Sequence, residues 1–407
     1  MSRARATAAG TLIGAALVAV GATAVRKQVR DGNDFPLYWQ AARELIAGHA
    51  LYDVGSGLHG YVYLPWFAWM IAPLAHLPLP VAAWVWYGAN VLFLIAAVRE
   101  LLAALRAVGL APRARTLLLA ALPLAGLAHD NLVLGQANLL LMWLLAVAVR
   151  GAVEPPSGLF LRGAALGLAA ALKMSAGLLA GPWLVRLRTP RLLAAAIGLG
   201  LALLAPLAIS GVDRGLAQLR DWRAKVLAPA AAGTLQGSKI IDQSPHAGLR
   251  RLLVDQPAFG EQRVNVASLD DGSFANLSRA VAGALVAVYF LIWLIAPAKL
   301  EPRALLLDMA LAACAMVQVT GFNLKAQFVV LLLPAWAAAA IAWTSEAGAT
   351  RAARVLLVAA AILFLLSQPG LVGRAASNWL LAYSSMAVGT LLLAAAVVTL
   401  RFRVTAT

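Results

Sequence analysis

The apolar run TLIGAALVAVGATAV at 11–25 and the polar, aromatic sequence NDFPLYW at 33–39 together define the class of this chain. The first is a candidate membrane span, and the second begins where that span would return to water. A carboxylate such as Asp34 is costly to hold at this boundary, so it is a functional candidate by default. Ten of the Trp and Tyr residues lie between positions 38 and 87. These features indicate a reaction at the membrane surface on a substrate that is part lipid and part polar.

The composition excludes a soluble protein. The chain has 407 residues, of which 62% are hydrophobic and only 12% are charged, whereas a soluble globular protein carries about 25% charged residues. Apolar runs of helix length recur, and they are too long for the strands of a membrane barrel. We therefore predict an all-α polytopic membrane protein that forms a single integral membrane domain over 1–407. The longest polar stretch, near 211–276, is too short for an ordinary soluble domain.

The net charge of +16 does not indicate nucleic-acid binding. The Lys and Arg residues lie mainly at the ends of apolar runs, where they anchor spans and pair with anionic lipid. The only cysteine, Cys314, excludes an internal disulfide and a cysteine-based metal cluster. We expect it to be a small buried apolar side chain.

Hydropathy and charge also predict an orientation. The N-terminus resembles a signal peptide, but basic residues at 26–30 follow without a convincing cleavage site, so we expect an uncleaved first span. Short connections rich in Lys and Arg place both termini in the cytoplasm, and they place a first outer loop at 26–65 and a long outer loop at 211–275 on the other side. The candidate crossings are 11–25, 82–105, 115–128, 138–149, 191–210, 276–296, 303–320, 326–343, 354–370 and 379–400, of which 115–128 and 138–149 are short and should extend into their flanks.

Three segments are expected to shape a site. The apolar segment 161–185 is interrupted at Lys173, so we predict two half-length helices that meet there and line a polar cavity. In the first outer loop, 36–47 reads as a short helix that Gly48 ends. The segment 64–75 is a second short apolar helix, and its tryptophans suit the headgroup region.

Asp34 is the leading candidate for a general base, because a carboxylate can take the proton from an attacking hydroxyl group. Helix N-capping is the alternative role, and Asp31 is the competing acid. Amide and other polar side chains can orient sugar hydroxyls through hydrogen bonds. Helix capping, turn formation or a solvated loop would also explain polar residues at these positions. The candidates for contacts with the sugar or the acceptor are Tyr38, Asp130, Gln136, Asn138, Gln243, Ser244 and His246.

Lys173 is buried by its sequence context, and a buried ammonium needs an anionic partner, for which a lipid phosphate is a natural candidate. Arginine side chains could hold a phosphate in the same way. Lys173 could instead pair with a carboxylate such as Asp130, and Lys325 could be a snorkelling anchor. The candidates for the donor phosphate are Lys173, Lys325 and, in the polar loop 234–251, Arg250 and Arg251.

The common nucleotide-binding and metal-binding motifs are absent from the sequence. It has no Walker loop, no dinucleotide glycine fingerprint and no HExxH. His129 has no second His at ligand spacing, so we expect neither a metal nor another cofactor. A nucleotide-sugar donor would require a soluble nucleotide-binding domain, so the expected donor is already in the membrane.

Five motifs follow one another along the chain: N-D-F-x-x-Y-x-x-A-A-x-x-L-x-x-G-x-x-L-Y at 33–52, Y-x-P at 63–65 with P-L at 73–74, G-Q-x-N at 135–138, G-x-x-x-A-x-K at 167–173 and D-Q-S at 242–244. In this order they resemble glycosyltransferase family 87, which includes the actinobacterial phosphatidylinositol mannoside mannosyltransferases. This chain departs from the family pattern at Asp242, where Asn is usual, at Leu64, which interrupts a double proline, and at 323–327, where histidines are common.

The resemblance implies a GT-C membrane fold with about 10–12 transmembrane helices and short interfacial helices in the first outer loop. It implies a polyprenyl-phosphate sugar donor, most often the mannose donor, a lipid or glycan acceptor, and inverting transfer without a metal. The catalytic acid of the first outer loop carries onto Asp34. A bacterial inner membrane with the site on its outer face is the expected location.

Two rival functions remain open on the sequence. Broken helices and intramembrane charge also suit a transporter or lipid flippase, which would predict an internal repeat, and no convincing repeat is found. A catalytically silent, partner-binding homologue is the third possibility, and the intact Asp34 argues against it.

Overall fold

Helices make up the regular structure of the computed structural model, which describes residues 3–30, 33–55, 60–154, 158–231, 240–296, 301–344 and 350–404. Two isolated bridges, between Asp242 and Leu324 and between Phe259 and Gln262, are the extended pairings within these ranges. The predicted all-α polytopic fold is therefore confirmed. It follows from long apolar segments, whose backbone polar groups can be satisfied in a bilayer only within helices or closed barrels.

The first half of the chain forms α1 (Arg3–Gln28), α2 (Asp34–Ala47), α3 (Pro65–Ala75), α4 (Leu79–Ala107), α5 (Ala114–Ala121), α6 (Ala125–Leu134), α7 (Asn138–Val153), α8 (Leu159–Leu172), α9 (Gly181–Val185) and α10 (Thr189–Ser210). The second half forms α11 (Val212–Trp222), α12 (Ala228–Ala231), α13 (Pro245–Leu253), α14 (Asp271–Ile295), α15 (Pro302–Val319), α16 (Leu332–Thr344), α17 (Arg351–Leu366), α18 (Pro369–Ala382) and α19 (Ser385–Val404). Short 3₁₀ turns occupy Leu51–Asp53, Leu122–Leu124, Met174–Ala180 and Lys325–Leu331, and a π-helical turn occupies Arg223–Leu227.

Seven helices of the described chain are long and apolar enough to cross a membrane, or eight if a bent pair counts as one span. The span Ala114–Leu134 combines α5 and α6, so the short crossing predicted at 115–128 does extend into its flank. Helices α7 and α8 are shorter apolar helices, and α1 is not among the seven. The described structure therefore holds fewer full-length spans than the number predicted.

The predicted crossing at 379–400 began too early. Residues up to Ala382 belong to α18, and α19 starts at Ser385. The turn between them contains Ser384, whose φ of 59° lies in the left-handed region. Helices α17 and α18 are bent by 91° relative to each other, because Pro369 stands at the start of α18 and cannot continue α17. Hydropathy alone does not detect such a corner.

The predicted break at Lys173 is confirmed, whereas the polar cavity beside it stays a prediction. Helix α8 ends at Leu172, Lys173 has extended backbone angles (φ −142°, ψ 114°), and a 3₁₀ turn leads into α9. The indole nitrogen of Trp66 in α3 donates to the carbonyl of Ala171 at 3.3 Å. This bond satisfies one of the carbonyls that the end of α8 leaves without a helical partner.

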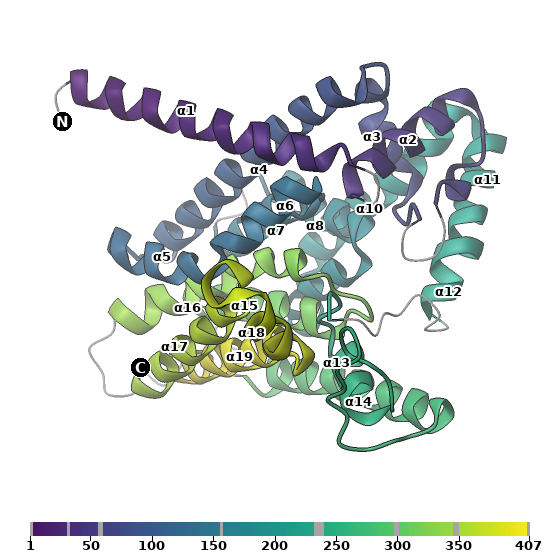
Figure 1. Ribbon diagram of the computed structural model, residues 1–407. Helices are drawn as coiled ribbons and strands as arrows, with labels where there is room; N and C mark the ends of the chain where they lie inside the picture. Colours follow the sequence, from purple (N-terminus) through teal and green to yellow (C-terminus); the bar gives the residue numbers. More distant parts are fainter. Residues whose placement is uncertain are drawn as a thin grey trace.

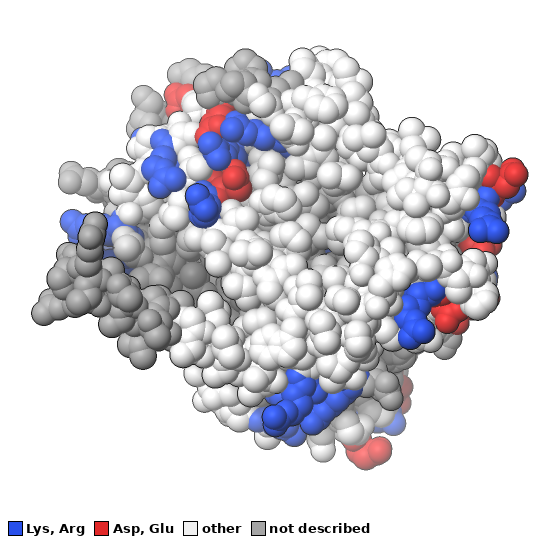
Figure 2. Space-filling view, turned by 90° about the horizontal axis from the view of Figure 1, so that it is seen from above, with Lys and Arg blue, Asp and Glu red and all other residues white. Residues whose placement is uncertain are grey.

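The core of the bundle surrounds α15 and α16. The most apolar 18-residue stretch is 83% buried inside the protein in the span that contains α15, and 89% buried in the span that contains α16. The corresponding buried share is only 22% in α10 and 17% in α14. The outer helices therefore present apolar side chains to the surroundings, as spans in contact with lipid do. Figure 2 shows one face of the molecule, on which charged side chains form a few separate clusters and leave a wide uncharged area.

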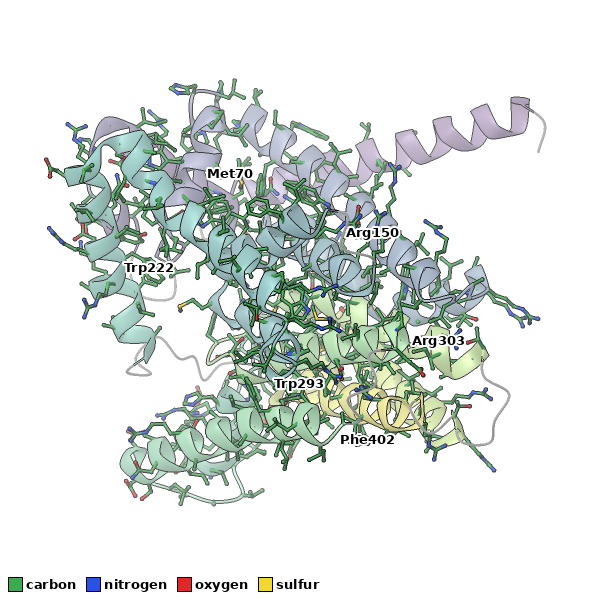
Figure 3. The ribbon with its side chains drawn as sticks, turned by 180° about the vertical axis from the view of Figure 1, so that it is seen from behind. Met70, Arg150, Trp222, Trp293, Arg303 and Phe402 are labelled. Atoms are coloured by element: carbon green, nitrogen blue, oxygen red, sulfur yellow. The ribbon has the colours of Figure 1, made fainter. Side chains whose placement is uncertain are left out.

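The bundle has two distinct ends (Figure 1). The start of α1, the end of α19, α5 and α17 lie toward the left, whereas α2, α11 and α12 lie toward the right. In the reverse view of Figure 3, Met70 and Trp222 accordingly lie on one side, and Arg150 and Arg303 lie toward the other. Which end faces the cytoplasm stays a prediction from the charge pattern.

Candidate active site

Helix α2 presents Asp34 as its first residue. Asn33 is the N-cap, with φ −93° and ψ 163°, and Gly48 ends the helix, so the helix predicted at 36–47 is confirmed. The Asn33 side chain makes no capping bond. Instead its amide nitrogen donates to the carbonyl of Lys27 at 2.6 Å and ties α2 to the end of α1. Asp34 is therefore not the N-cap, and its carboxylate is left for other contacts.

Polar groups from distant parts of the chain surround the Asp34 carboxylate. The amide nitrogen of Gln136 donates to Asp34 Oδ2 at 3.0 Å. Burial raises the pKa of Asp34 above its ordinary value, and the hydrogen bond from Gln136, the charge of Lys173 and the hydroxyl of Tyr38 each lower it in part. The net result is a carboxylate of raised basicity, which is the property that a general base needs.

A chain of buried amides holds Gln136 in place. The Asn138 amide donates to Gln136 Oε1 and, at 2.9 Å, to Asn131 Oδ1. Asn131 in turn donates to the carbonyls of Leu127 and Ala326 at 2.8 and 2.7 Å. Gln136 and Asn138 are 3% and 1% exposed. This burial favours a role for both amides in orienting Asp34 from within the protein, and their contacts with sugar hydroxyls stay a prediction.

The turn that delivers Gln136 depends on Gly135. This residue has a φ of +70°, and a Cβ atom built there would lie 2.6 Å from both Gln28 Nε2 and Phe35 Cβ. Its carbonyl accepts from the indole of Trp86 at 2.8 Å. The ends of α1 and α6 and the start of α2 thus meet closely at one glycine, which sets the position of Gln136 relative to Asp34.

Aromatic rings form one side of the site. The hydroxyls of Tyr38 and Tyr63 lie 2.9 Å apart, and their rings meet edge to face with centroids 5.2 Å apart. Phe67 packs against both rings. Burial, and to a smaller extent the negative charge of Asp34, raise the pKa of Tyr63. Tyr63 was not among the predicted site residues, although the Y-x-P motif at 63–65 marked it.

Lys173 lies at the break after α8 and is half-buried. Its charge acts on Asp34, so the structure brings together Asp34 and Tyr38 of α2, Gln136 after α6 and Lys173 after α8, from three separate segments. In the described part of the chain no carboxylate forms an ion pair with Lys173. The alternative pair between Lys173 and Asp130 is therefore wrong, because Asp130 pairs with Lys325 at 3.2 Å.

Lys325 also donates to Gln368 Oε1 at 3.1 Å. Its ammonium therefore bridges α6 and the start of α18 and is 18% exposed. These contacts favour a structural role for Lys325, and its roles as a phosphate contact or as a snorkelling anchor stay predictions. Asp130 has the same role and does not line the site around Asp34 by any described contact.

The element at 242–244 is a structural junction. Asp242 Oδ1 accepts from the backbone nitrogens of Ser244 and Asn323, each at 2.9 Å. The Ser244 hydroxyl caps α13, and the Gln243 amide donates to the carbonyls of Ile240 and Leu381 at 2.8 and 2.9 Å. Gln243 and Ser244 are fully buried, which favours a structural role for both, and their contacts with a ligand stay a prediction.

Arg251 completes this junction. Its guanidinium is fully buried and donates to the carbonyls of Ala382 and Asp242 at 3.0 and 2.8 Å and to the Ser384 hydroxyl at 2.9 Å. The guanidinium joins α13 to the corner between α18 and α19. These bonds favour a structural role for Arg251, and its contact with the donor phosphate stays a prediction.

Arg250 and His246 lie on the side of α13 that faces α14. Arg250 pairs with Asp271 at 2.7 Å and lies over the ring of Phe274. His246 Nδ1 lies 2.6 Å from the Ser278 hydroxyl, and burial and the charge of Arg250 lower the pKa of His246 to about 4. Helices α13 and α14 lie at the lower right of Figure 1, apart from α2 at the upper right. No contact joins these two residues to Asp34 within the described chain.

Two of the sequence predictions lie outside the described residues: the competing acid Asp31 and the first part of the polar loop, 234–239. Within the described chain, no group of three or more His, Cys, Asp or Glu side chains is placed to hold a metal ion. Independence from metal stays a prediction.

The model of glycosyltransferase family 87 matches residues 61–321 of the chain. The chain belongs to glycosyltransferase family 87. Searches of curated proteins and of solved structures find no match.

Because it belongs to family 87, this protein is a membrane glycosyltransferase. The family match favours this function over the alternative of a transporter or lipid flippase. The matched range includes Tyr63, Gln136 and Lys173 and begins after Asp34. The assignment of Asp34 therefore rests on the geometry of the site and on the motif at 33–52.

Proposed function

We propose that this protein transfers mannose from a polyprenyl-phosphate donor to a hydroxyl group of a lipid or glycan acceptor, in one inverting step that uses no metal. The observation that carries the proposal is the convergence of a half-buried carboxylate and a half-buried ammonium, Asp34 and Lys173, beside a wall of tyrosines. Each charge has a distinct part in a displacement at the anomeric carbon.

Asp34 is the general base of the proposed reaction. The acceptor O–H bond breaks as its proton passes to the Asp34 carboxylate, and the acceptor oxygen forms a bond to the anomeric carbon. The hydrogen bond from Gln136 at 3.0 Å fixes the carboxylate in one orientation. Since Gln136 engages Oδ2, Oδ1 is the oxygen that we assign to the acceptor proton.

Lys173 stabilises the leaving group. As the bond between the anomeric carbon and the phosphate oxygen breaks, its electron pair stays on that oxygen, and the ammonium compensates the charge that develops there. The extended backbone at Lys173 and the 3₁₀ turn after it interrupt an otherwise apolar segment. A break of this kind holds a cation at membrane depth, where a lipid-linked phosphate could reach it.

The tyrosine wall accounts for recognition. Aromatic faces pack against the apolar faces of sugar rings, and the paired hydroxyls of Tyr38 and Tyr63 offer hydrogen bonds beside Asp34. The short helices α2 and α3 lie beside this wall, which suits a site at the membrane surface. The positive-inside pattern favours the outer face of a bacterial inner membrane, with both termini in the cytoplasm.

The test measures transfer by membranes that contain the full-length protein, with radiolabelled polyprenyl-phosphate mannose as donor and GDP-mannose as the comparison donor. We expect a mannosylated lipid or glycan from the first donor only. Asp34→Asn should reduce turnover by about 10²–10⁴-fold, the usual contribution of a general base.

Asp53→Asn is the matched control, because the Asp53 carboxylate is 64% exposed, pairs with Lys225 and touches no group of the site. It should change turnover by less than about twofold, as a weak surface ion pair implies. Near-normal turnover of folded Asp34→Asn would remove Asp34 from its role. Transfer from GDP-mannose in place of the lipid donor would overturn the proposed donor class.

A further inference from the structure

A large cavity lies between helices that take no part in the site around Asp34. Its volume is about 910 Å³, and α5, α16, α17 and α19 contribute its lining, so it falls in the upper part of the range for ligand pockets, about 300–1,000 Å³. Small side chains leave the space, among them Ala335, Ala339 and Ala361. Leu119 and Val358, which are 68% and 49% exposed, lie at its edge. The cavity is therefore accessible from the surroundings of the bundle.

The cavity has the depth of one membrane leaflet. Its lining runs along α17 from Arg354 to Phe364, and along the first part of the span Ala114–Leu134 from Arg115 to Leu124. At 1.5 Å per residue these distances are about 14–15 Å. The hydrocarbon core of a bilayer is about 30 Å thick, so the hollow extends from one surface to about the middle of the membrane.

Positive charge gathers at the shallow end. Arg113 and Arg115 are exposed and line the cavity at the start of α5. Arg354 lines it at the start of α17 and donates to the carbonyl of Ala342 at 2.8 Å. No carboxylate of the described residues forms an ion pair with Arg113 or Arg115. The ligand that fits has an anionic head and an apolar tail of about one leaflet's length.

This cavity is at the opposite membrane face from the candidate active site. Arg113 precedes the span Ala114–Leu134, and Gln136 follows it. The length of 21 residues corresponds to about 30 Å of helix, which is the thickness of the hydrocarbon core. Figure 1 likewise shows α5 and α17 on the left and α2 on the right. A lipid bound here therefore comes from the leaflet opposite to the donor.

We propose that this cavity is a binding site for an anionic phospholipid. Arg113 and Arg115 bind the phosphate of the headgroup, since guanidinium groups match phosphate oxygens through paired charge-assisted hydrogen bonds. One acyl chain fills the apolar hollow and restores the dispersion contacts that the alanines leave unmade. The bound lipid packs α5 against α17.

The test titrates the delipidated, full-length protein in detergent with phosphatidylglycerol and, separately, with phosphatidylcholine, and measures bound lipid by native mass spectrometry. We expect tighter binding of phosphatidylglycerol. The double variant Arg113→Gln/Arg115→Gln should weaken phosphatidylglycerol binding about 10-fold or more, because basic residues near a surface attract anionic lipid, and should change phosphatidylcholine binding much less. Arg106→Gln, an exposed arginine at the end of α4 outside the cavity, is the charge-matched control and should leave both affinities unchanged.

A second variant tests the hollow itself. Ala361→Phe keeps every charge and fills the space, so it should weaken the binding of both lipids at least about fivefold, as loss of the apolar contacts implies. Unchanged phosphatidylglycerol binding in Arg113→Gln/Arg115→Gln would overturn the proposal, and so would an equal loss in Arg106→Gln. Unchanged binding in Ala361→Phe would show that only surface charge attracts the lipid, which would also overturn it.

Discussion

Replacing Gly135 by alanine tests whether the turn after α6 positions the catalytic carboxylate. The new Cβ would lie 2.6 Å from Gln28 Nε2 and from Phe35 Cβ. An ordinary carbon contact is about 3.5 Å or longer, so the turn must move by about 1 Å relative to α1 and α2. Gln136 moves with it and loses its orientation toward Asp34. Misplacement by about 1 Å can reduce turnover by about 10²-fold.

Gly109→Ala is the control for backbone strain. Gly109 has the same φ of +70°, but its added Cβ would meet only Arg303 Nη2, at an ordinary 3.6 Å. Both substitutions incur the left-handed penalty of about 1–2 kcal/mol. Only Gly135→Ala adds the overpacking penalty, about 1–3 kcal/mol.

The assay compares initial rates of mannose transfer with thermal unfolding in detergent for the two variants. We expect Gly109→Ala to unfold at a lower temperature with a rate within about threefold of the parent protein, and Gly135→Ala to lose about 100-fold in rate while it remains folded. Equal rates for the two folded variants would refute the positioning role of the turn.

Three further outcomes follow from the charges. The rate should fall with decreasing pH through a pKa above the ordinary carboxyl range, because burial raises the pKa of Asp34 and only the ionised form accepts a proton; Lys173→Met should move that fall to higher pH, and an unshifted pH–rate profile would contradict this coupling. Since the folded state holds the Asp34 proton more tightly than the unfolded state, the stability that this group contributes is present at low pH and lost as pH rises through the raised pKa; Asp34→Asn should therefore unfold at an equal or higher temperature at neutral pH, and a lower unfolding temperature would contradict the sign. Arg251→Ala should reduce stability by about 3–5 kcal/mol because it breaks a buried charged network. Arg250→Ala removes a partly exposed ion pair and should reduce stability by about 1 kcal/mol or less. Similar melting temperatures for the two variants would show that Arg251 does not hold the buried junction together.

Local patterns predicted much of the fold. The break at Lys173 follows from a polar interruption in an apolar run, and the bounds of α2 follow from Asn33 and Gly48, because each signal acts within a few residues of its own position. The corner at Ser384 was missed, since the apolar composition continues across it. Hydropathy is averaged over many residues, so it does not detect a single residue such as Ser384 with left-handed backbone angles.

The sequence indicated the key carboxylate of the site but not the partners that surround it. Asp34 stood out because an ionisable group at a membrane boundary is costly. The direction of the Gln136 amide could not be inferred, since its partner is 102 residues away in the chain. Arg250 and Arg251 are adjacent in the sequence, but a helix turns about 100° per residue. One therefore faces α14, and the other enters the buried junction.

The most direct test of the central claim is a single-turnover measurement with Asp34→Asn preloaded with labelled polyprenyl-phosphate mannose. Donor binding and product formation are recorded in the same sample. We predict that the donor binds within about threefold of the parent affinity while product forms about 10²–10⁴-fold more slowly. Product formation at the parent rate would contradict the assignment of Asp34 as the base.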